Sequence, residues 1–274
     1  MAKSPRAKKP RAARKPARRK AGYRLPLPDP KLSAGPYRPF ASDPGWNDAW
    51  WWLGIPVAAA IFVFVSYRLD PAWYNFWVTR EGIGVLELAQ FIMMVIGLAI
   101  AVQLLLDPFV RQRPLVLLMT ILAAMTCLYI GGEEVSWGQH IFYLEEIGHI
   151  TEVNKSGEFG IHNAYESFEK VPRAILQFAV IVGGLLVPIW CALAPRWRAS
   201  RIALFLPSAI LVPAALGVVL FKLVELLAKT QTVQLAGRPS EAVEFYLYFF
   251  ILAYLIVFER RISEMETDEA GSRN

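Results

Sequence analysis

The sequence contains few of the side chains that usually build disulfides or metal sites: only 2 Cys and 3 His occur among 274 residues. Cys127 and Cys191 each lie inside an apolar run, without CxxC spacing or a Cys/His partner. This pattern supports neither a disulfide framework nor a thiolate zinc site, so we expect two buried, inert thiols. An internal repeat is also lacking, so the inverted-repeat organisation of many transporters is not evident.

Charged residues are scarce, at 19%, whereas 55% of the residues are hydrophobic and the chain holds 9 Trp, 10 Tyr and 16 Phe. Soluble domains of this length rarely have such a composition, which favours a membrane protein. A helix needs about 20 apolar residues to cross a hydrocarbon core of about 30 Å. Six segments are long enough: 50–67, 83–106, 114–130, 174–193, 202–227 and 242–258. The predicted fold is an all-α, polytopic membrane helix bundle with about six transmembrane helices.

The charges of the connecting segments predict the orientation, because Lys and Arg are kept on the cytoplasmic side. The segment before the first span is basic, and the short connections 107–113 and 195–201 contain two and three arginines. The long connection 133–172 instead holds eight glutamates and two lysines. With six crossings, this pattern predicts cytoplasmic N- and C-termini and places the acidic loop on the outer side.

The N-terminal tail is rich in Lys, Arg, Ala and Pro and poor in apolar residues, so we expect it to be disordered. It could neutralise nucleic-acid phosphates or lie on anionic lipid headgroups. The aromatic cluster in 37–52 suits the membrane interface and favours the lipid headgroups, which makes nucleic acid unlikely as a partner. The predicted organisation is a tail at 1–47, a six-helix transmembrane domain at 48–259 with the acidic loop at 133–172, and a cytoplasmic tail at 260–274.

Carboxylates recur at the outer ends of the predicted spans. Glu87 lies about one turn inside the second span, Glu133 and Glu134 close the third, and Glu241 and Glu244 begin the sixth. Ionisable groups at this depth are costly and usually face the protein interior or a water-filled cavity. We therefore predict that acids from separate helices converge on one polar site. The alternative is that they cap helix ends near water, where Glu at a helix start also suits the dipole.

Glu225 and Glu133 each allow a second interpretation. Glu225, near the outer end of the fifth span, lies three residues from Lys222, and these two side chains could simply pair. If the third helix continues past its glycines, Glu133, Ser136 and His140 share one face, with Trp137 nearby. Side chains on a single helix rarely reach the linear arrangement of a catalytic triad, so a metal or hydrogen-bond cluster shared with other helices is favoured.

All three histidines lie in or beside the acidic loop. The glycines at 157 and 160 before His162 indicate a tight re-entrant turn that could bring the imidazole back to the membrane face. One or two histidines with several carboxylates suit a hard or borderline cation such as zinc, manganese or iron. A divalent metal is therefore a candidate cofactor, with Glu133, His162 and Glu244 as candidate ligands.

Four segments together resemble a group of uncharacterised bacterial multi-pass inner-membrane proteins: EGIGVLELAQ, GGEEVSWGQHIF, GEFGIHN and SEAVEF. The resemblance covers about residues 81–258 and implies an inner-membrane location but no established activity. This sequence departs from the group's pattern at His140, where the group has Arg. The difference weakens a role for an imidazole at that position. The residues that the resemblance places in the pattern are Glu133, Glu134, Ser136, Trp137, Gln139, Glu158, His162, Asn163, Glu241 and Glu244.

Two functional classes follow from these patterns. One is a membrane-embedded, metal-dependent enzyme acting on a lipid or lipid-linked substrate from the outer leaflet. The other is non-catalytic, either a scaffold or a cation- or proton-linked transporter. The candidate catalytic residues are Glu133, Glu134, Ser136 and His162, and the candidate binding residues are Glu87, Trp137, Gln139, His140, Asn163, Glu241 and Glu244.

Overall fold

The computed structural model describes residues 40–80, 84–135, 166–194, 197, 202–230 and 234–271, with the backbone alone for 166–170. Within these ranges the regular structure is helical throughout. Six helical segments are long and apolar enough to cross a membrane: Trp46–Leu69, Val85–Leu106, Pro114–Glu134, Val171–Leu193, Ala203–Lys229 and Pro239–Gly271. Each coincides with one predicted span, so the all-α, six-span fold is confirmed. The basic tail predicted to be disordered lies mostly outside the described residues.

The first half of the chain supplies three of the spans and the short helices between them. The elements are η2 (Trp46–Asp48), α1 (Ala49–Trp52), α2 (Gly54–Leu69), α3 (Pro71–Trp77), α4 (Val85–Leu106), α5 (Pro108–Arg111) and α6 (Pro114–Glu134). Aspartates start the two connecting helices: Asp70 accepts the backbone N–H of Trp73 at 2.9 Å, and Asp107 accepts that of Phe109 at 2.7 Å. A proline follows each of these caps, where its missing N–H has no cost.

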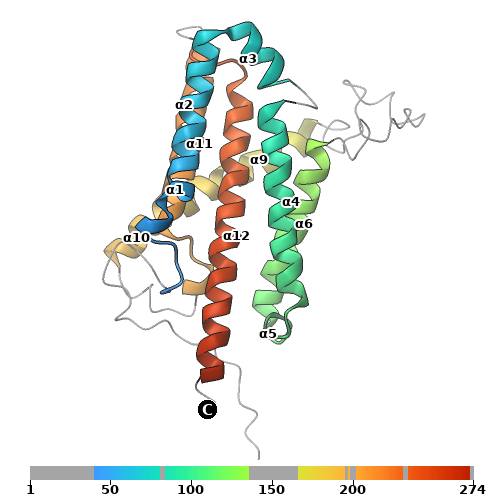
Figure 1. Cartoon of the computed structure of the whole chain (residues 1–274), viewed down its shortest axis with the longest axis vertical. Coiled ribbons are helices and arrows are strands. Elements are labelled where there is room, and N and C mark those ends of the chain that lie inside the picture. The colour runs from blue at the N-terminus through green and yellow to red at the C-terminus, as the bar shows by residue number, and fades with distance from the viewer. Residues whose placement is uncertain are drawn as a thin grey trace, which may run out of the picture.

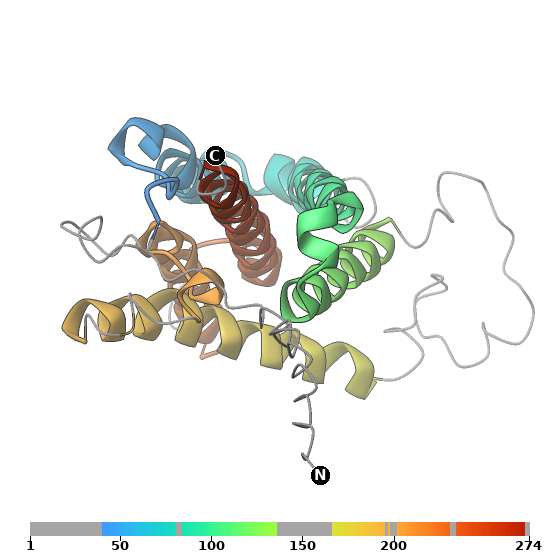
Figure 2. The same ribbon diagram turned by 90° about the horizontal axis from the view of Figure 1, so that it is seen from below.

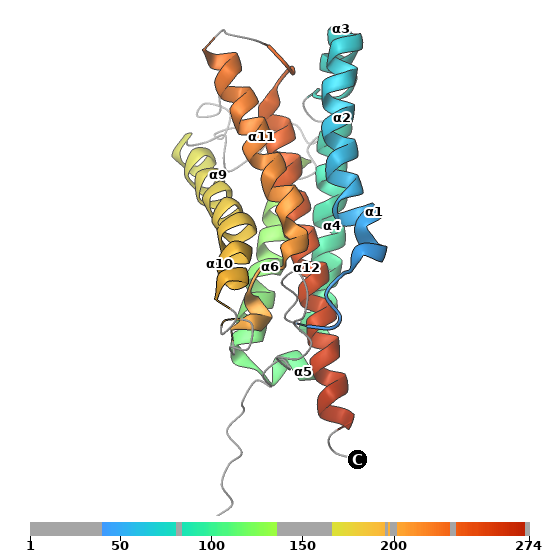
Figure 3. The same ribbon diagram turned by 90° about the vertical axis from the view of Figure 1, so that its left-hand side faces the viewer.

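The second half contains α9 (Glu166–Ile181), the π-helical turn η5 (Val182–Leu186), α10 (Val187–Leu193), η7 (Ala203–Phe205), η8 (Ala209–Leu211), α11 (Val212–Lys229) and α12 (Pro239–Gly271). The spans run alternately up and down, and α4 begins at the same end of the bundle as α12 (Figures 1 and 3). With 33 residues, α12 is about 50 Å long at 1.5 Å per residue. It therefore extends well beyond a hydrocarbon core of about 30 Å.

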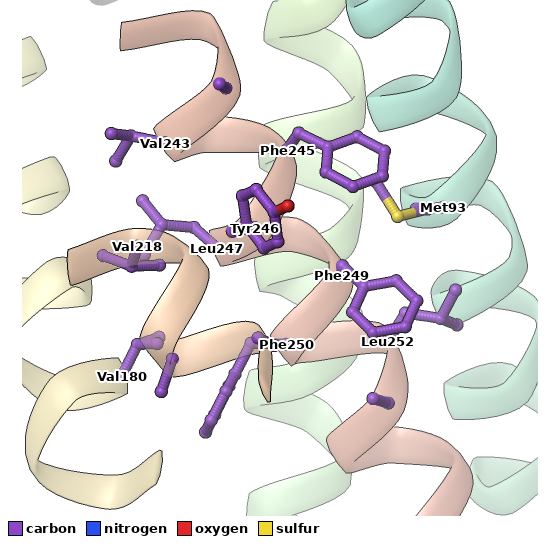
Figure 4. Close-up of a cluster of buried hydrophobic side chains, with 14 of the residues drawn as sticks. Met93, Val180, Val218, Val243, Phe245, Tyr246, Leu247, Phe249, Phe250 and Leu252 are labelled. Atoms are coloured by element: carbon purple, nitrogen blue, oxygen red, sulfur yellow. The ribbon is translucent and has the colours of Figure 1, made fainter. Parts of the chain in front are cut away.

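The last helix is the centre of the bundle. Seen along the bundle, α12 lies between α2 and α11 on one side and α4 and α6 on the other (Figure 2). In the most apolar stretch of α12, 78% of the residues are buried inside the bundle, against 22–50% in the other spans. The apolar side chains that the other spans leave exposed can face lipid. Figure 4 shows Phe245 and Phe249 directed toward Met93 of α4, and Phe250 directed toward Val180 of α9.

A glycine allows two of these helices to approach closely. A Cβ at Gly217 of α11 would overlap the ring of Tyr246 on α12. The Tyr246 hydroxyl donates a hydrogen bond of 2.5 Å to the carbonyl of Pro56 in α2. One tyrosine thus joins three helices, and it fits because Gly217 has no side chain.

A buried ion pair fixes the other end of the bundle. Arg261 of α12 is fully buried and bidentate to Asp43, with Nε–Oδ1 at 2.6 Å and Nη2–Oδ2 at 2.8 Å. Its Nη1 also donates to the carbonyls of Ala203, Leu204 and Leu206. Ser208 completes the set by donating to Asp43 at 3.1 Å. This Arg261–Asp43 clamp attaches the segment before the first span to the last helix.

Candidate functional site: an acidic cluster at one end of the bundle

The predicted acids are carried by helix ends that meet at one end of the bundle. Glu87 lies in the first turn of α4, Glu134 is the last residue of α6, and Glu241 and Glu244 lie in the first two turns of α12. Figures 1 and 3 show that α4 and α12 both begin at this end, close to the end of α6. The topology therefore gathers carboxylates from three helices, and we call this group the acidic cluster.

The centre of the acidic cluster is a contact between α6 and α12. The side chain of Tyr248 lies close enough to the Glu134 carboxylate to interact with it. Glu87 and Glu241 lie close enough to interact electrostatically with Glu134, and so does Arg173 of α9. The structure thus brings Glu87, Glu134 and Glu241 together, and it adds a tyrosine and an arginine.

Arginines accompany the two acids of α12. Arg173 forms an ion pair with Glu244, and Arg238 lies 3.5 Å from Glu241. The two glutamates are only 7% and 8% exposed. An acid buried to this degree needs a charged or hydrogen-bonded partner, because removing it from water costs several kcal/mol otherwise. The arginines therefore make it possible for these acids to lie inside the bundle.

The sequence reasoning missed these arginines and Tyr248. Arg238 precedes Glu241 by three residues, and Tyr248 follows Glu244 by four, spacings that place side chains on one face of a helix. Both were therefore detectable from spacing. Arg173 lies on a different helix from Glu244, so its partnership depends on tertiary packing that spacing does not reveal.

Buried polar groups surround the backbone of the first turn of α12. Gln90 of α4 donates to the carbonyl of Glu241 at 2.9 Å, and Arg238 donates to the carbonyl of Thr79 at 2.7 Å. Tyr74 of α3 is fully buried; burial raises the pKa of its phenol, and the carboxylate of Glu241 raises this pKa further. Tyr74 is therefore a neutral hydroxyl at physiological pH.

The helix that carries Glu133 ends earlier than the shared-face prediction required. α6 passes through both glycines but stops at Glu134, and Val135 leaves helical geometry with φ −110° and ψ 18°. Two glycines and two acids form its last turn, where glycine has low helix propensity and the helix dipole disfavours negative charge. The helix therefore does pass its glycines, but Ser136 and His140 lie outside the described residues, and the face that they would share with Glu133 stays a prediction.

The remaining predicted site residues lie outside the described part of the chain. They are Ser136, Trp137, Gln139, His140, His162 and Asn163. Glu133 is described, is partly buried and has interaction partners. Among the described ranges, no group of three or more His, Cys, Asp or Glu side chains is placed to hold a metal ion. Metal binding by Glu133, His162 and Glu244 stays a prediction, and Glu244 already has Arg173 as a partner.

Two simpler predictions are confirmed. Glu225 of α11 pairs with Lys222 at 2.8 Å and also with Lys229 at 2.6 Å, on its own helix. Cys127 and Cys191 are both buried and free of disulfides. Glu225 is thus an acid at a helix end whose charge is balanced locally.

Six apolar helices with an acidic, arginine-paired cluster at one end define a multi-pass membrane protein. Comparison with protein-family models, with curated proteins and with solved structures found no match to this chain. A helical membrane bundle supports many activities, so the function has to follow from the chemistry of the site.

Proposed function

We propose that the chain is an inner-membrane protein with both termini in the cytoplasm and the acidic cluster at the periplasmic end. The charge pattern supports this orientation. The connection that carries Arg111 and Arg113 lies around α5, at the end of the bundle opposite the cluster (Figure 1). The C-terminal end of α12 lies there too. The basic tail, residues 1–24, would then lie on anionic lipid headgroups of the cytoplasmic leaflet.

For the activity, we propose a membrane-embedded enzyme that acts on a lipid or lipid-linked substrate. The observation that carries this proposal is the approach of Tyr248 to Glu134 within a group that includes Glu87 and Glu241. A carboxyl group with a hydroxyl group and further acids nearby is suited to take up and release a proton during a reaction. Its depth, at the end of a membrane span, gives access to substrates held in the bilayer.

In this proposal Glu134 is the catalytic acid or base, and Tyr248 is a positioning residue that orients it. Arg173 and Arg238 balance the charges of Glu244 and Glu241 and keep the site folded. Ser136 and His162 would join from the adjoining segment, and His162 with Glu133 would supply any divalent metal site. Such a metal would polarise a scissile ester or phosphoester bond.

Two observations count against the non-catalytic alternatives. A scaffold that receives a basic protein partner needs carboxylates exposed to water, whereas Glu241 and Glu244 are only 8% and 7% exposed. A carrier holds its cargo near the bilayer midplane between broken helices. Here the acidic cluster lies at one end of the bundle, and α4, α6 and α12 are each uninterrupted.

The test compares membrane lipids and envelope glycans in cells with and without the protein. Cells lacking it would be complemented with the wild type, with Glu134→Gln or with Tyr248→Phe. The matched control is Glu225→Gln, an acid at a helix end that lies outside the acidic cluster. We expect the control to restore the profile, Glu134→Gln to fail, and Tyr248→Phe to restore it in part.

Two results would overturn the proposed enzymatic function. One is an unchanged lipid and glycan profile in cells that lack the protein, and the other is full restoration by Glu134→Gln. Metal analysis of the purified protein, before and after Glu133→Ala and His162→Ala, separately tests the metal. Absence of bound metal in the wild type would refute metal dependence without touching the role of Glu134.

A further inference from the structure

An apolar groove of about 250 Å³ lies between α6 and α9, with α12 as its floor. The walls include Ala123 and Thr126 from α6 and Leu176 and Ala179 from α9, and the floor includes Phe250 and Tyr254 from α12. All six belong to membrane-spanning segments. We therefore expect the groove to face lipid tails rather than water.

One end of this groove lies next to the acidic cluster. Along α9, Leu176 follows Arg173 by three residues; along α12, Phe250 follows Glu244 by six. Along α6, Thr126 precedes Glu134 by eight. At 1.5 Å per residue these separations are about 5 to 12 Å. A molecule whose chain fills the groove would thus place its polar end at the acidic cluster.

The length of the groove indicates what can occupy it. Phe250 and Phe258, which both line its floor, are eight residues apart on α12, or about 12 Å along the axis, close to the ~15 Å depth of one leaflet. An extended hydrocarbon chain within one leaflet fits this length.

The charges at the polar end favour one class of head group. Glu87, Glu134, Glu241 and Glu244 gather there, and the arginines found with them among the described residues are Arg173 and Arg238. Both arginines are engaged in ion pairs with acids of α12. A head group with net negative charge would be repelled, whereas one that donates hydrogen bonds finds carboxylate acceptors.

From these observations we propose that the groove holds one hydrocarbon chain of a lipid whose head donates hydrogen bonds and carries no net negative charge. This inference deepens the proposed function, because it specifies the class of lipid that reaches Glu134. The chain-binding part depends only on the groove.

The experiment uses the full chain in vesicles made of equal parts phosphatidylethanolamine and phosphatidylglycerol. A trace of one of these lipids carries a photoreactive diazirine in an acyl chain, and the cross-linked residues are located by mass spectrometry. We expect cross-links to concentrate on the α6 and α12 residues of the groove. The phosphatidylethanolamine probe should label them several-fold more strongly than the phosphatidylglycerol probe.

Variants that fill the groove provide the specificity test. Ala123→Phe should lower labelling about fivefold or more, because an added ring cannot share the space with a chain. Ala179→Phe does the same from the opposite wall, so the test survives if one variant fails to fold. The control is Met125→Phe on α6, where Met125 is 62% exposed and does not line the groove; its labelling should match the wild type.

Three results would overturn the inference: labelling spread evenly over all lipid-facing helices, equal labelling by both probes, or cross-links from the groove to another polypeptide. The proposed function can fail separately. If loss of the protein leaves lipids and glycans unchanged while the groove is labelled, the enzyme is refuted and chain binding stands. If Glu134→Gln abolishes complementation while labelling is uniform, the proposed enzymatic function stands and lipid binding in the groove is refuted.

Discussion

Replacing Arg261 with Ala should cause a large loss of stability. The change leaves Asp43, which is only 3% exposed, as a buried carboxylate that keeps Ser208 as a donor but loses its cation. It also removes the donors to the carbonyls of Ala203, Leu204 and Leu206. Breaking a buried ion pair from one side typically costs about 3–5 kcal/mol. At roughly 2–4 °C per kcal/mol for a domain of about this size, the melting temperature should fall by roughly 6–20 °C.

The assay is thermal unfolding of the purified protein in detergent, followed by circular dichroism. The matched control is the neighbouring Arg260→Ala, because Arg260 is more exposed and lies 3.4 Å from Asp48. Such an exposed pair contributes about 0–1 kcal/mol. Arg261→Lys should lie between the two, since it keeps the charge but loses the bidentate geometry. Equal melting temperatures for Arg261→Ala and Arg260→Ala would refute the reasoning.

Two further predictions concern the packing of the bundle. Gly217→Ala should destabilise the protein by about 1–3 kcal/mol, because the added methyl overlaps the ring of Tyr246. The control in the same unfolding assay is Gly54→Ala, where the new Cβ makes only ordinary contacts. Equal stability of the two variants would contradict this explanation. Burial raises the pKa of Tyr74, so its contribution to folding stability is fully present below the usual tyrosine pKa of about 10 and is lost as the pH rises above it. Tyr74→Phe should therefore make the fall in stability above about pH 10 less steep in the same unfolding assay. An unchanged slope would contradict this assignment.

The sequence predicted the six spans because crossing lipid imposes one constraint on each segment separately, a long apolar helix. It predicted the ends less well. The third span was expected to stop near residue 130, yet α6 continues through both glycines to Glu134. The last helix continues to Gly271, because Arg261 and Glu269 find partners in Asp43 and Arg113, far away in the sequence.

For the acidic cluster, the sequence indicated which acids lie at helix ends but not which of them meet. Glu225 and Glu241 look alike in the sequence, since each lies near the end of an apolar run. Glu225 is balanced by lysines of its own helix, whereas the side chain of Glu241 is buried and lies near Glu134 of another helix. Side-chain direction depends on how the helices are rotated against each other, and that rotation follows from packing around α12 as a whole.

A single uninterrupted helix carries both two acids of the acidic cluster and the buried cation at the far end. From Glu244 to Arg261 is 17 residues of continuous helix, or about 25 Å. The Arg261–Asp43 clamp and the acidic cluster thus share one continuous element. We therefore expect a change that frees Asp43 at one end of α12 to alter the position of Tyr248 at the other end.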